Sequence, residues 1–386
     1  MLSKKFRFLD YYLVIPYLLL CLIGIVMVYS SSADIASQNG GSPTAYLIKQ
    51  SLYVVMGLVV VWFITAMNIK ILQSPRFLIL FAAVLLGALL FVKLFGQAVN
   101  GAQGWINLGV INIQPAEVCK IFLILYLGRM LSQHENKIST DFFSSVGGPL
   151  LLSIIFVVLI LIQPDLGGAV INGAIIMIMM LASGISWKKG VIAIFTIIFG
   201  FVLVVLPLLS RVAQSGAIHS YQLQRIVAFV NPFGTAQGAG SQLVNSYYAL
   251  SNGGVFGVGL GNSIQKMGYL PEPNTDFIMA VIGEELGLIT VVLIMCLLTI
   301  IVARIIWLGV RSADAYSSLV CYGVATFITI QTLFNVGGVT GLLPITGVTF
   351  PFVSYGGSSM LVLCTALGCV LNISARQARS RLIAAV

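Results

Sequence analysis

The chain has 386 residues, of which 59% are hydrophobic and 8% are charged, and its formal net charge is +9. The mean hydropathy is +1.05. In a water-soluble domain about a quarter of the residues are charged, so these values exclude a soluble globular protein. They predict an all-α polytopic membrane protein, organised as a single integral-membrane domain over residues 1–386.

Apolar runs long enough to cross a hydrocarbon core of roughly 30 Å as helices recur along the whole chain. They predict about ten transmembrane helices, at residues 11–30, 46–66, 77–95, 114–131, 146–162, 168–184, 191–209, 277–307, 317–337 and 352–372. The first run resembles a signal peptide, but it is long for one, and further spans follow it. We therefore interpret it as an uncleaved anchor. The six cysteines lie in these runs without C-x-x-C spacing, which indicates packing residues.

Lysine and arginine are distributed unequally between the two sides of this predicted bundle. With the N-terminus inside, fourteen fall on the cytoplasmic side and five outside, and Lys120 lies within a span. Because cytoplasmic loops are enriched in Lys and Arg, both termini are predicted to be cytoplasmic. The large loop 210–275, between the seventh and eighth helices, is then extracellular, and its aromatic and apolar residues predict short interfacial helices. The net charge is a topology signal and implies no nucleic-acid partner.

Scarce carboxylates gather in one stretch, YLPEPNTDFIMAVIGEELG, at residues 269–287. It contains Glu272, Asp276, Glu284 and Glu285. Asp276 is predicted to stand at the outer end of the eighth helix, where it is available for chemistry. At the helical rise per residue, Glu284 and Glu285 lie roughly 12 to 14 Å deeper. Charges at that depth need partners within the membrane.

A partner for these deep acids is predicted in the fourth helix. Glu117 and Lys120 are three residues apart on one face of that helix. Because the helix also enters from outside, Lys120 should lie at a depth comparable to that of Glu284. We predict one interhelical ion network of Glu117, Lys120 and Glu284 or Glu285, and we favour a packing role for it over direct catalysis. For Asp276 we favour a direct role in catalysis over a packing role.

Two further stretches of the exterior side admit more than one interpretation. Asp165 in QPDLGG either caps the sixth helix or belongs to the site. The glycines of GGVFGVGLGNS, residues 253–263, are more typical of backbone turns than of a phosphate cradle, because no βαβ unit surrounds them.

Several stretches, spread in order from the first helix to the last, resemble a known family. They are DYYLVIPYLLLCLIGIVMVYSSS, NGAQGWINLG, INIQPAEVCK, QPDLGGAV, YQLQRIVAFVNP, SNGGVFGVGLGNSIQKMGYLPEPNTDFIMAVIGEELG and LLPITGVTFPFVSYGGSSM. The whole chain resembles the SEDS family (shape, elongation, division and sporulation) of peptidoglycan glycosyltransferases. Within it, the division type is a better match than the elongation type.

The resemblance implies an activity and a catalytic residue. The activity is polymerisation of lipid II into β-1,4 glycan strands on the outer face of the bacterial cytoplasmic membrane during cell division, with undecaprenyl pyrophosphate leaving. The acid of the TDF motif, here Asp276, is the implied general base, because the attacking C4 hydroxyl must lose a proton. Since an α-linked donor becomes a β-linked product, the transfer inverts the anomeric carbon.

The pyrophosphate leaving group calls for cations or a divalent metal such as Mg or Mn. The exterior candidates are Arg225, Lys266, Arg211 and Lys49. For Arg225 and Lys266, contact with lipid headgroups is the alternative. Trp105 either anchors the chain at the membrane interface or contacts the sugar.

Two functions of other classes remain alternatives: a lipid II flippase, for which the deep charges would matter more than Asp276, and a non-catalytic division scaffold. The resemblance also implies partners, namely a class B penicillin-binding protein that acts as transpeptidase, and other division proteins.

Overall fold

A computed structural model of the chain describes residues 8–38, 40–99, 102–107, 112–135, 142–184, 221–238 and 240–384, together with residues 109, 192, 199 and 203. The long helices of this part are α2 (Tyr11–Gln38), α3 (Ala45–Ala66), α5 (Pro75–Phe95), α6 (Pro115–Gln133), α8 (Phe142–Ile162), α9 (Leu166–Ala182), α14 (Ile278–Val310), α15 (Ala315–Thr340) and α16 (Gly357–Ala384). The short ones are α4 (Ile69–Leu72), α12 (Tyr221–Val230), the 3-10 turn η2 (Phe233–Thr235) and α13 (Ser241–Gly253).

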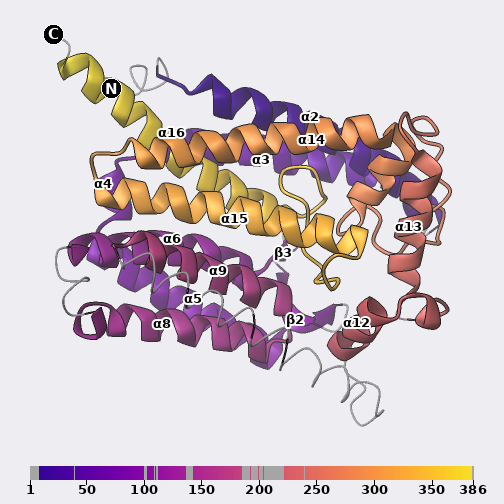
Figure 1. The fold of residues 1–386 in the computed structure, drawn as a ribbon, viewed down its shortest axis with the longest axis horizontal. Coiled ribbons are helices and arrows are strands. Elements are labelled where there is room, and N and C mark those ends of the chain that lie inside the picture. The colour runs from indigo at the N-terminus through magenta and orange to yellow at the C-terminus, as the bar shows by residue number, and fades with distance from the viewer. Residues whose placement is uncertain are drawn as a thin grey trace.

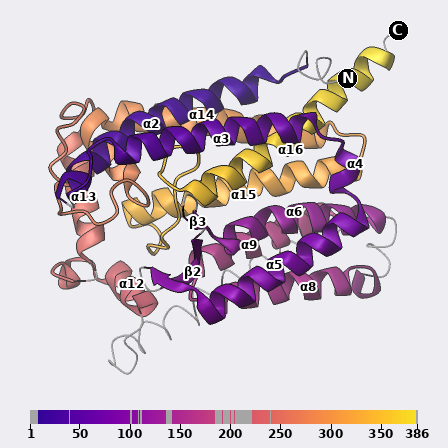
Figure 2. The same cartoon turned by 180° about the vertical axis from the view of Figure 1, so that it is seen from behind.

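The long helices run side by side as one elongated bundle (Figure 1). One group holds α2, α3, α14, α15 and α16, and the other holds α5, α6, α8 and α9; α15 packs on both α6 and α9 and joins the two groups. The turned view in Figure 2 shows α12 and α13 at one end of the bundle, whereas α16 ends at the other, and the strands lie at the end of the α5, α6, α8 and α9 group that faces α12.

The predicted class of fold is confirmed. Six described helices are long and apolar enough to cross a membrane, α8 and α9 contribute shorter apolar helices, and the whole is consistent with about ten spans. The predicted seventh span, residues 191–209, lies almost entirely outside the described residues. The large loop contains the short helices α12 and α13, as its aromatic and apolar residues predicted.

Three predicted helix boundaries are wrong. The last helix begins at Gly357 rather than 352, after a turn at residues 351–354. The first helix continues to Gln38 rather than ending near residue 30, and the last continues to Ala384 rather than ending at 372. Hydropathy reports where apolar residues stop, whereas a helix can continue through polar residues that find partners. Ser32, for example, is fully buried and donates to the Val28 carbonyl at 2.5 Å.

The loop between α5 and α6 forms three short antiparallel strands that the sequence analysis did not predict. These are β1 (Gln97–Val99), β2 (Ala102–Asn107) and β3 (Asn112–Ile113), with β2 in the middle. In this register Ile106 pairs with Ile113 and Asn107 with Asn112. Trp105 belongs to the middle strand β2, which with β3 connects the end of α5 to the start of α6.

Helix α14 is interrupted at Gly287, whose φ of 76° and ψ of 178° are not helical. The interruption would leave backbone groups without partners inside the bundle, and a neighbouring segment supplies those partners. Val258 N–H donates to the Glu284 carbonyl at 2.9 Å, and Leu288 N–H donates to the Gly254 carbonyl at 3.0 Å. We call this segment, residues 253–259, the clasp.

The clasp needs glycine because its backbone lies directly against that of α14. A Cβ added at Gly253 would be 1.9 Å from the Gly283 carbonyl oxygen, and one at Gly257 would be 2.2 Å from that of Glu285. The turn interpretation of the GGVFGVGLGNS stretch is thus confirmed, and the clasp also makes a close contact between two backbones.

Substitution of Gly257 tests this contact. Gly257 has a φ of +79°, and Gly261 has a comparable φ of +86° with no atom near an added Cβ. We predict that Gly261→Ala costs about 1 to 2 kcal/mol for its backbone conformation. Gly257→Ala should cost about 1 to 3 kcal/mol more, because it adds a steric clash. Unfolding of the two variants in detergent measures the difference, and equal stabilities would contradict the close contact.

Candidate active site

A cavity of about 760 Å³ lies among residues of α6, α12 and the loops near them. Its charged lining residues are Glu117, Asp165, Arg225, Glu272 and Asp276, and Trp105 also lines it. These residues come from β2, α6, the turn between α8 and α9, α12 and the turn before α14. The fold therefore brings Asp276, Asp165, Arg225 and Trp105 of the predicted site around one space.

Main-chain hydrogen bonds hold the segment that carries Asp276. Asn335 of α15 donates to the Asp276 carbonyl at 2.7 Å. The Ser354 hydroxyl donates to the Thr275 carbonyl at 2.6 Å, and the Tyr355 N–H donates to the Asn274 carbonyl at 2.9 Å. Three consecutive residues are thus fixed from neighbouring elements, which leaves the half-buried Asp276 carboxylate directed into the cavity.

The side chains of Arg225 and Asp276 both lie close to Gly347. Gly347, with a φ of +74°, lies beneath both side chains: a Cβ added there would be 3.1 Å from Arg225 Nη1 and 3.3 Å from Asp276 Oδ2. Arg225 also donates to the Ile345 carbonyl at 3.4 Å. The absence of a side chain at Gly347 therefore gives the cation and the acid room to approach each other.

Partial burial raises the pKa of Asp276 to about 6. The nearby Arg225 guanidinium opposes this rise because it stabilises the carboxylate, and the Glu272 carboxylate adds to the rise by repulsion. A carboxyl group with such a pKa is mostly ionised at neutral pH and is a better proton acceptor than an ordinary aspartate.

Asp165 caps α9, one of the two interpretations of its sequence, and it also lines the cavity. Its Oδ1 accepts from the Gly168 N–H at 2.7 Å and so caps α9, and its Oδ2 accepts from Gln114 Nε2 at 3.0 Å while the residue lines the cavity. Burial raises the pKa of its carboxyl, and the hydrogen bond from Gly168 opposes that rise.

Lys120 is fully buried below the cavity. It forms an ion pair with Glu117 at 2.5 Å, donates to Gln331 Oε1 at 3.4 Å and lies over the ring of Phe327. Gln331 in turn donates to the Thr349 carbonyl at 3.0 Å. The pair thus connects α6 to α15 and, through it, to the loop before α16.

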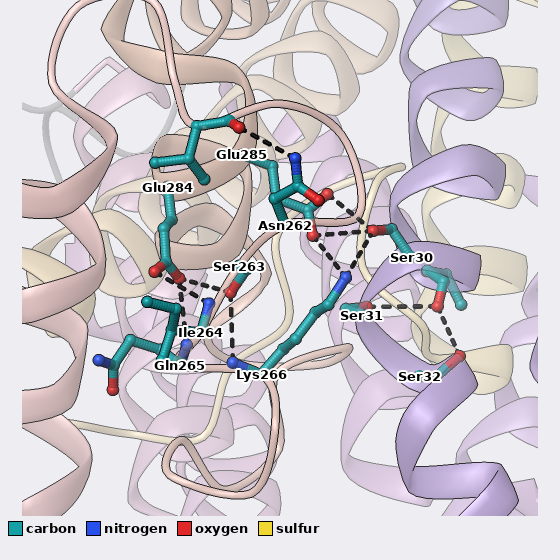
Figure 3. Close-up of polar contacts among 12 residues, drawn as sticks. Ser30, Ser31, Ser32, Asn262, Ser263, Ile264, Gln265, Lys266, Glu284 and Glu285 are labelled. Carbon is teal, nitrogen blue, oxygen red and sulfur yellow. Dashed lines mark hydrogen bonds and ion pairs between the residues drawn. The ribbon is translucent and has the colours of Figure 1, made fainter.

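The other deep charges form a separate network, shown in Figure 3. Lys266 pairs with Glu285 at 2.8 Å, and the Ser30 hydroxyl of α2 donates to the same carboxylate. Glu284 accepts from Asn252 at 2.9 Å and from the Ile264 N–H at 3.1 Å, and Ser263 also donates to it. Both carboxylates are fully buried.

The prediction of one network linking Lys120 to Glu284 or Glu285 is therefore wrong. Spacing along the chain gave comparable depths, but depth does not fix which helices are neighbours, and α14 contacts α2 and α13 where Glu284 and Glu285 lie. Lys266 was expected among the exterior cations, yet it is 3% exposed and paired with Glu285 outside the cavity lining.

The remaining predicted cations, Lys49, Arg211 and Arg225, differ in whether they lie at the cavity. Lys49 is exposed on the first turn of α3, near the ring of Tyr46, and does not line the cavity. Arg211 lies outside the described residues. Arg225 is thus the predicted cation that the described structure places beside Asp276.

The sequence analysis missed the polar residues that position Asp276. Asn335 and Ser354 are uncharged and lie in stretches that were interpreted only as spans or as matches to a family. The signal available in the sequence was polar residues on the otherwise apolar α15 and the run of loop-forming residues at 341–357. Their targets are backbone carbonyls distant in sequence, which no local pattern identifies.

Fold and site together define a polytopic membrane protein with an acid-lined cavity at one end. Comparison with known sequences agrees: a family described as cell cycle proteins, named for FtsW, RodA and SpoVE, matches residues 11–379. The chain belongs to this family.

Similar relatives come from several bacteria. The chain is 40% identical to a probable peptidoglycan glycosyltransferase FtsW of Bacillus subtilis, over 97% of this chain and 92% of that protein. It is 38% identical to the Lactococcus lactis FtsW over 97% and 94%, and 35% identical to stage V sporulation protein E of Bacillus subtilis over 95% and 96%.

Solved structures show the same fold. A chain from a peptidoglycan synthase complex, studied for its coordination of polymerization and crosslinking, aligns with a TM-score of 0.76 and 25% identity, over 96% of this chain and 98% of that one. The rod shape determining protein RodA of Thermus thermophilus aligns with a TM-score of 0.65 and 25% identity, over 95% and 96%.

Two lysines of the predicted cation set provide a matched test of the Figure 3 network. Lys266→Met leaves Glu285 as an unpaired buried charge, which should lower the free energy of unfolding by about 3 to 5 kcal/mol. Lys49→Met removes the same charge from an exposed position and should change it by no more than about 0.5 kcal/mol. Unfolding in SDS titrations measures both.

The double variant Lys266→Met/Glu285→Met serves as the control for that test. Because it removes both charges together, it should recover much of the stability that the single Lys266 variant loses. A double variant as unstable as the sum of its single variants would contradict a specific pair.

Proposed function

We propose that this chain is a peptidoglycan glycosyltransferase that polymerises lipid II into β-1,4 glycan strands during cell division. The observation that carries the proposal is the convergence of Asp276 and Arg225 over Gly347, in a cavity of about 760 Å³ at one end of a membrane-spanning bundle. A membrane-embedded donor with a large polar headgroup requires such a site. The sequence similarity to peptidoglycan glycosyltransferases supports the same reaction.

The reaction is an inverting displacement in which Asp276 acts as the general base. The C4 oxygen of the acceptor sugar attacks the anomeric carbon of the donor, and its proton passes to the Asp276 carboxylate. As the new C–O bond forms, the bond to the pyrophosphate breaks, and undecaprenyl pyrophosphate leaves with the electron pair. One base suffices, because no covalent sugar intermediate is needed.

Other residues of the cavity would contact the pyrophosphate and the sugar. Arg225, beside Asp276, places a cation where the pyrophosphate develops charge. Trp105 lines the cavity, which favours contact with the sugar over a purely interfacial role. Asp165 and Gln114 form a hydrogen-bonded pair on the same cavity and offer polar groups to the saccharide.

A divalent cation fits this site only if water and substrate oxygens provide most of its ligands. Among the described residues, no group of three or more His, Cys, Asp or Glu side chains is arranged to hold a metal. Mg²⁺ commonly takes one or two carboxylates and completes its shell with water and phosphate oxygens. In the proposal Glu272, which also lines the cavity, would hold the ion together with water and pyrophosphate oxygens, and the ion would neutralise charge on the pyrophosphate. Asp276 is then left free to accept the proton.

The proposal includes an orientation and a partner. The excess of Lys and Arg on the side opposite the cavity supports an active site on the outer face of the cytoplasmic membrane. The structural likeness to a chain of a synthase complex that couples polymerization to crosslinking supports assembly with a class B penicillin-binding protein. Other division proteins would bind as well.

The structure gives little support to the flippase alternative. It requires the deep charges to lie along a pathway for the substrate. Lys266, Glu284 and Glu285 instead form closed contacts outside the lining of the cavity. The scaffold alternative does not explain why Arg225 and Asp276 lie close together on the cavity.

Polymerisation of purified lipid II by the purified protein, alone and with its cognate transpeptidase, tests the proposal. Asp276→Asn should lower the rate by about 10²- to 10⁴-fold, because it removes the proton acceptor. Asp34→Asn, which neutralises an acid outside the cavity lining, should keep the wild-type rate. Polymer from Asp276→Asn at that rate would contradict the assignment, and translocation of lipid II without polymer would favour the flippase.

The pH dependence of the wild-type enzyme provides a second check. The base must be ionised, and its pKa is raised to about 6. The value of kcat/KM should therefore be constant above this pKa and fall about tenfold per pH unit well below it. An acid limb that stays flat down to pH 4, with the protein folded, would exclude Asp276 as the titrating base.

A further inference from the structure

Aromatic and cationic side chains converge at the end of the bundle opposite the cavity. The end of α14 carries Trp307, and the guanidinium carbons of Arg304, Arg311 and Arg381 lie 4.1, 4.7 and 5.6 Å from its ring centroids. Arg381 comes from the last turn of α16, so two helices contribute. We call these four residues the Trp307 cluster.

The cluster carries more positive charge than its neighbours compensate. Asp10 forms an ion pair with Arg304 at 2.8 Å. No described carboxylate forms an ion pair with Arg311 or Arg381, and both are exposed. The carboxylate of Asp314, close in sequence, accepts from Ser317 at 2.6 Å. Three like charges around one ring repel each other, so an anion bound among them would stabilise the arrangement.

An apolar surface adjoins these cations. Large hydrophobic side chains of the same two helix ends are exposed, and they are Ile306, Val310, Leu382 and Ile383. Val310 is 67% exposed and Ile383 is 68% exposed. A small soluble anion would need only the guanidinium groups. The combination of cations at a helix end with apolar side chains beside them matches an amphipathic ligand.

We propose that the Trp307 cluster binds the headgroup of an anionic phospholipid, with its acyl chains along the exposed apolar residues of α14 and α16. Guanidinium groups make paired hydrogen bonds to phosphate oxygens, and the indole holds them in place by cation–π contacts. The distribution of Lys and Arg predicts that this end is cytoplasmic, where anionic lipids attract basic segments. The site is independent of the glycosyltransferase assignment.

Native mass spectrometry of the full chain in detergent, titrated with phosphatidylglycerol and with phosphatidylcholine, tests this site. The wild type should bind phosphatidylglycerol in preference. Removing two phosphate contacts with Arg311→Gln/Arg381→Gln should weaken that binding about thirtyfold. Trp307→Leu keeps every charge but removes the cation–π contacts, and it should also weaken binding.

A matched control distinguishes a specific lipid site from general electrostatic attraction between the lipid and basic residues. Lys70 and Arg76 are exposed at the same end of the bundle, at α4 and the start of α5 (Figure 1). Lys70→Gln/Arg76→Gln removes the same charge and should leave lipid binding unchanged. Equal losses in the two double variants, or no preference for phosphatidylglycerol, would overturn the proposal. Displacement of the lipid by equimolar inorganic phosphate would instead assign the cluster to a free anion.

Discussion

The structure depends on how the interruption of α14 is stabilised inside the helix bundle. A backbone break there is stable only when another segment supplies the missing hydrogen bonds. The clasp does so around Gly287, with Val258 bonded to the Glu284 carbonyl and Leu288 bonded to that of Gly254. Glu284 and Glu285 adjoin the break, and the residues that follow the clasp provide partners for both, with Ile264 N–H donating to Glu284 and Lys266 pairing with Glu285. The part of α14 that follows Asp276 is thereby held as a separate short helix.

A fixed short helix allows the active site to be assembled from distant segments. Asp276 precedes it, and hydrogen bonds from α15 and from the loop before α16 hold the Asp276 backbone. The cavity therefore holds Asp276 near one cation, Arg225, by means of side chains that are themselves uncharged. Charges needed for packing, such as Lys266 and Lys120, are paired elsewhere, so they leave the local electrostatics of Asp276 to Arg225 and Glu272.

The sequence predicted those parts that obey local rules. Hydropathy located the spans, and the small number of acids in an apolar chain drew attention to Asp276. The partners of Lys120 and Lys266 were not predictable in this way, since ion pairing depends on which helices are neighbours, and hydropathy carries no information about that. The three strands near Trp105 were missed because they are short and irregular. The supporting roles of Asn335 and Ser354 were missed because each binds a remote carbonyl.

The measurement that most directly tests the account is the acid limb of the pH–rate profile in two charge-neutralising variants. Arg225 lowers the pKa of Asp276 and Glu272 raises it. Arg225→Gln should therefore move the acid limb of kcat/KM to higher pH, and Glu272→Gln should move it to lower pH. Shifts in opposite directions would show that Asp276 is the titrating base. Limbs that stay in place, or that move together, would contradict the account.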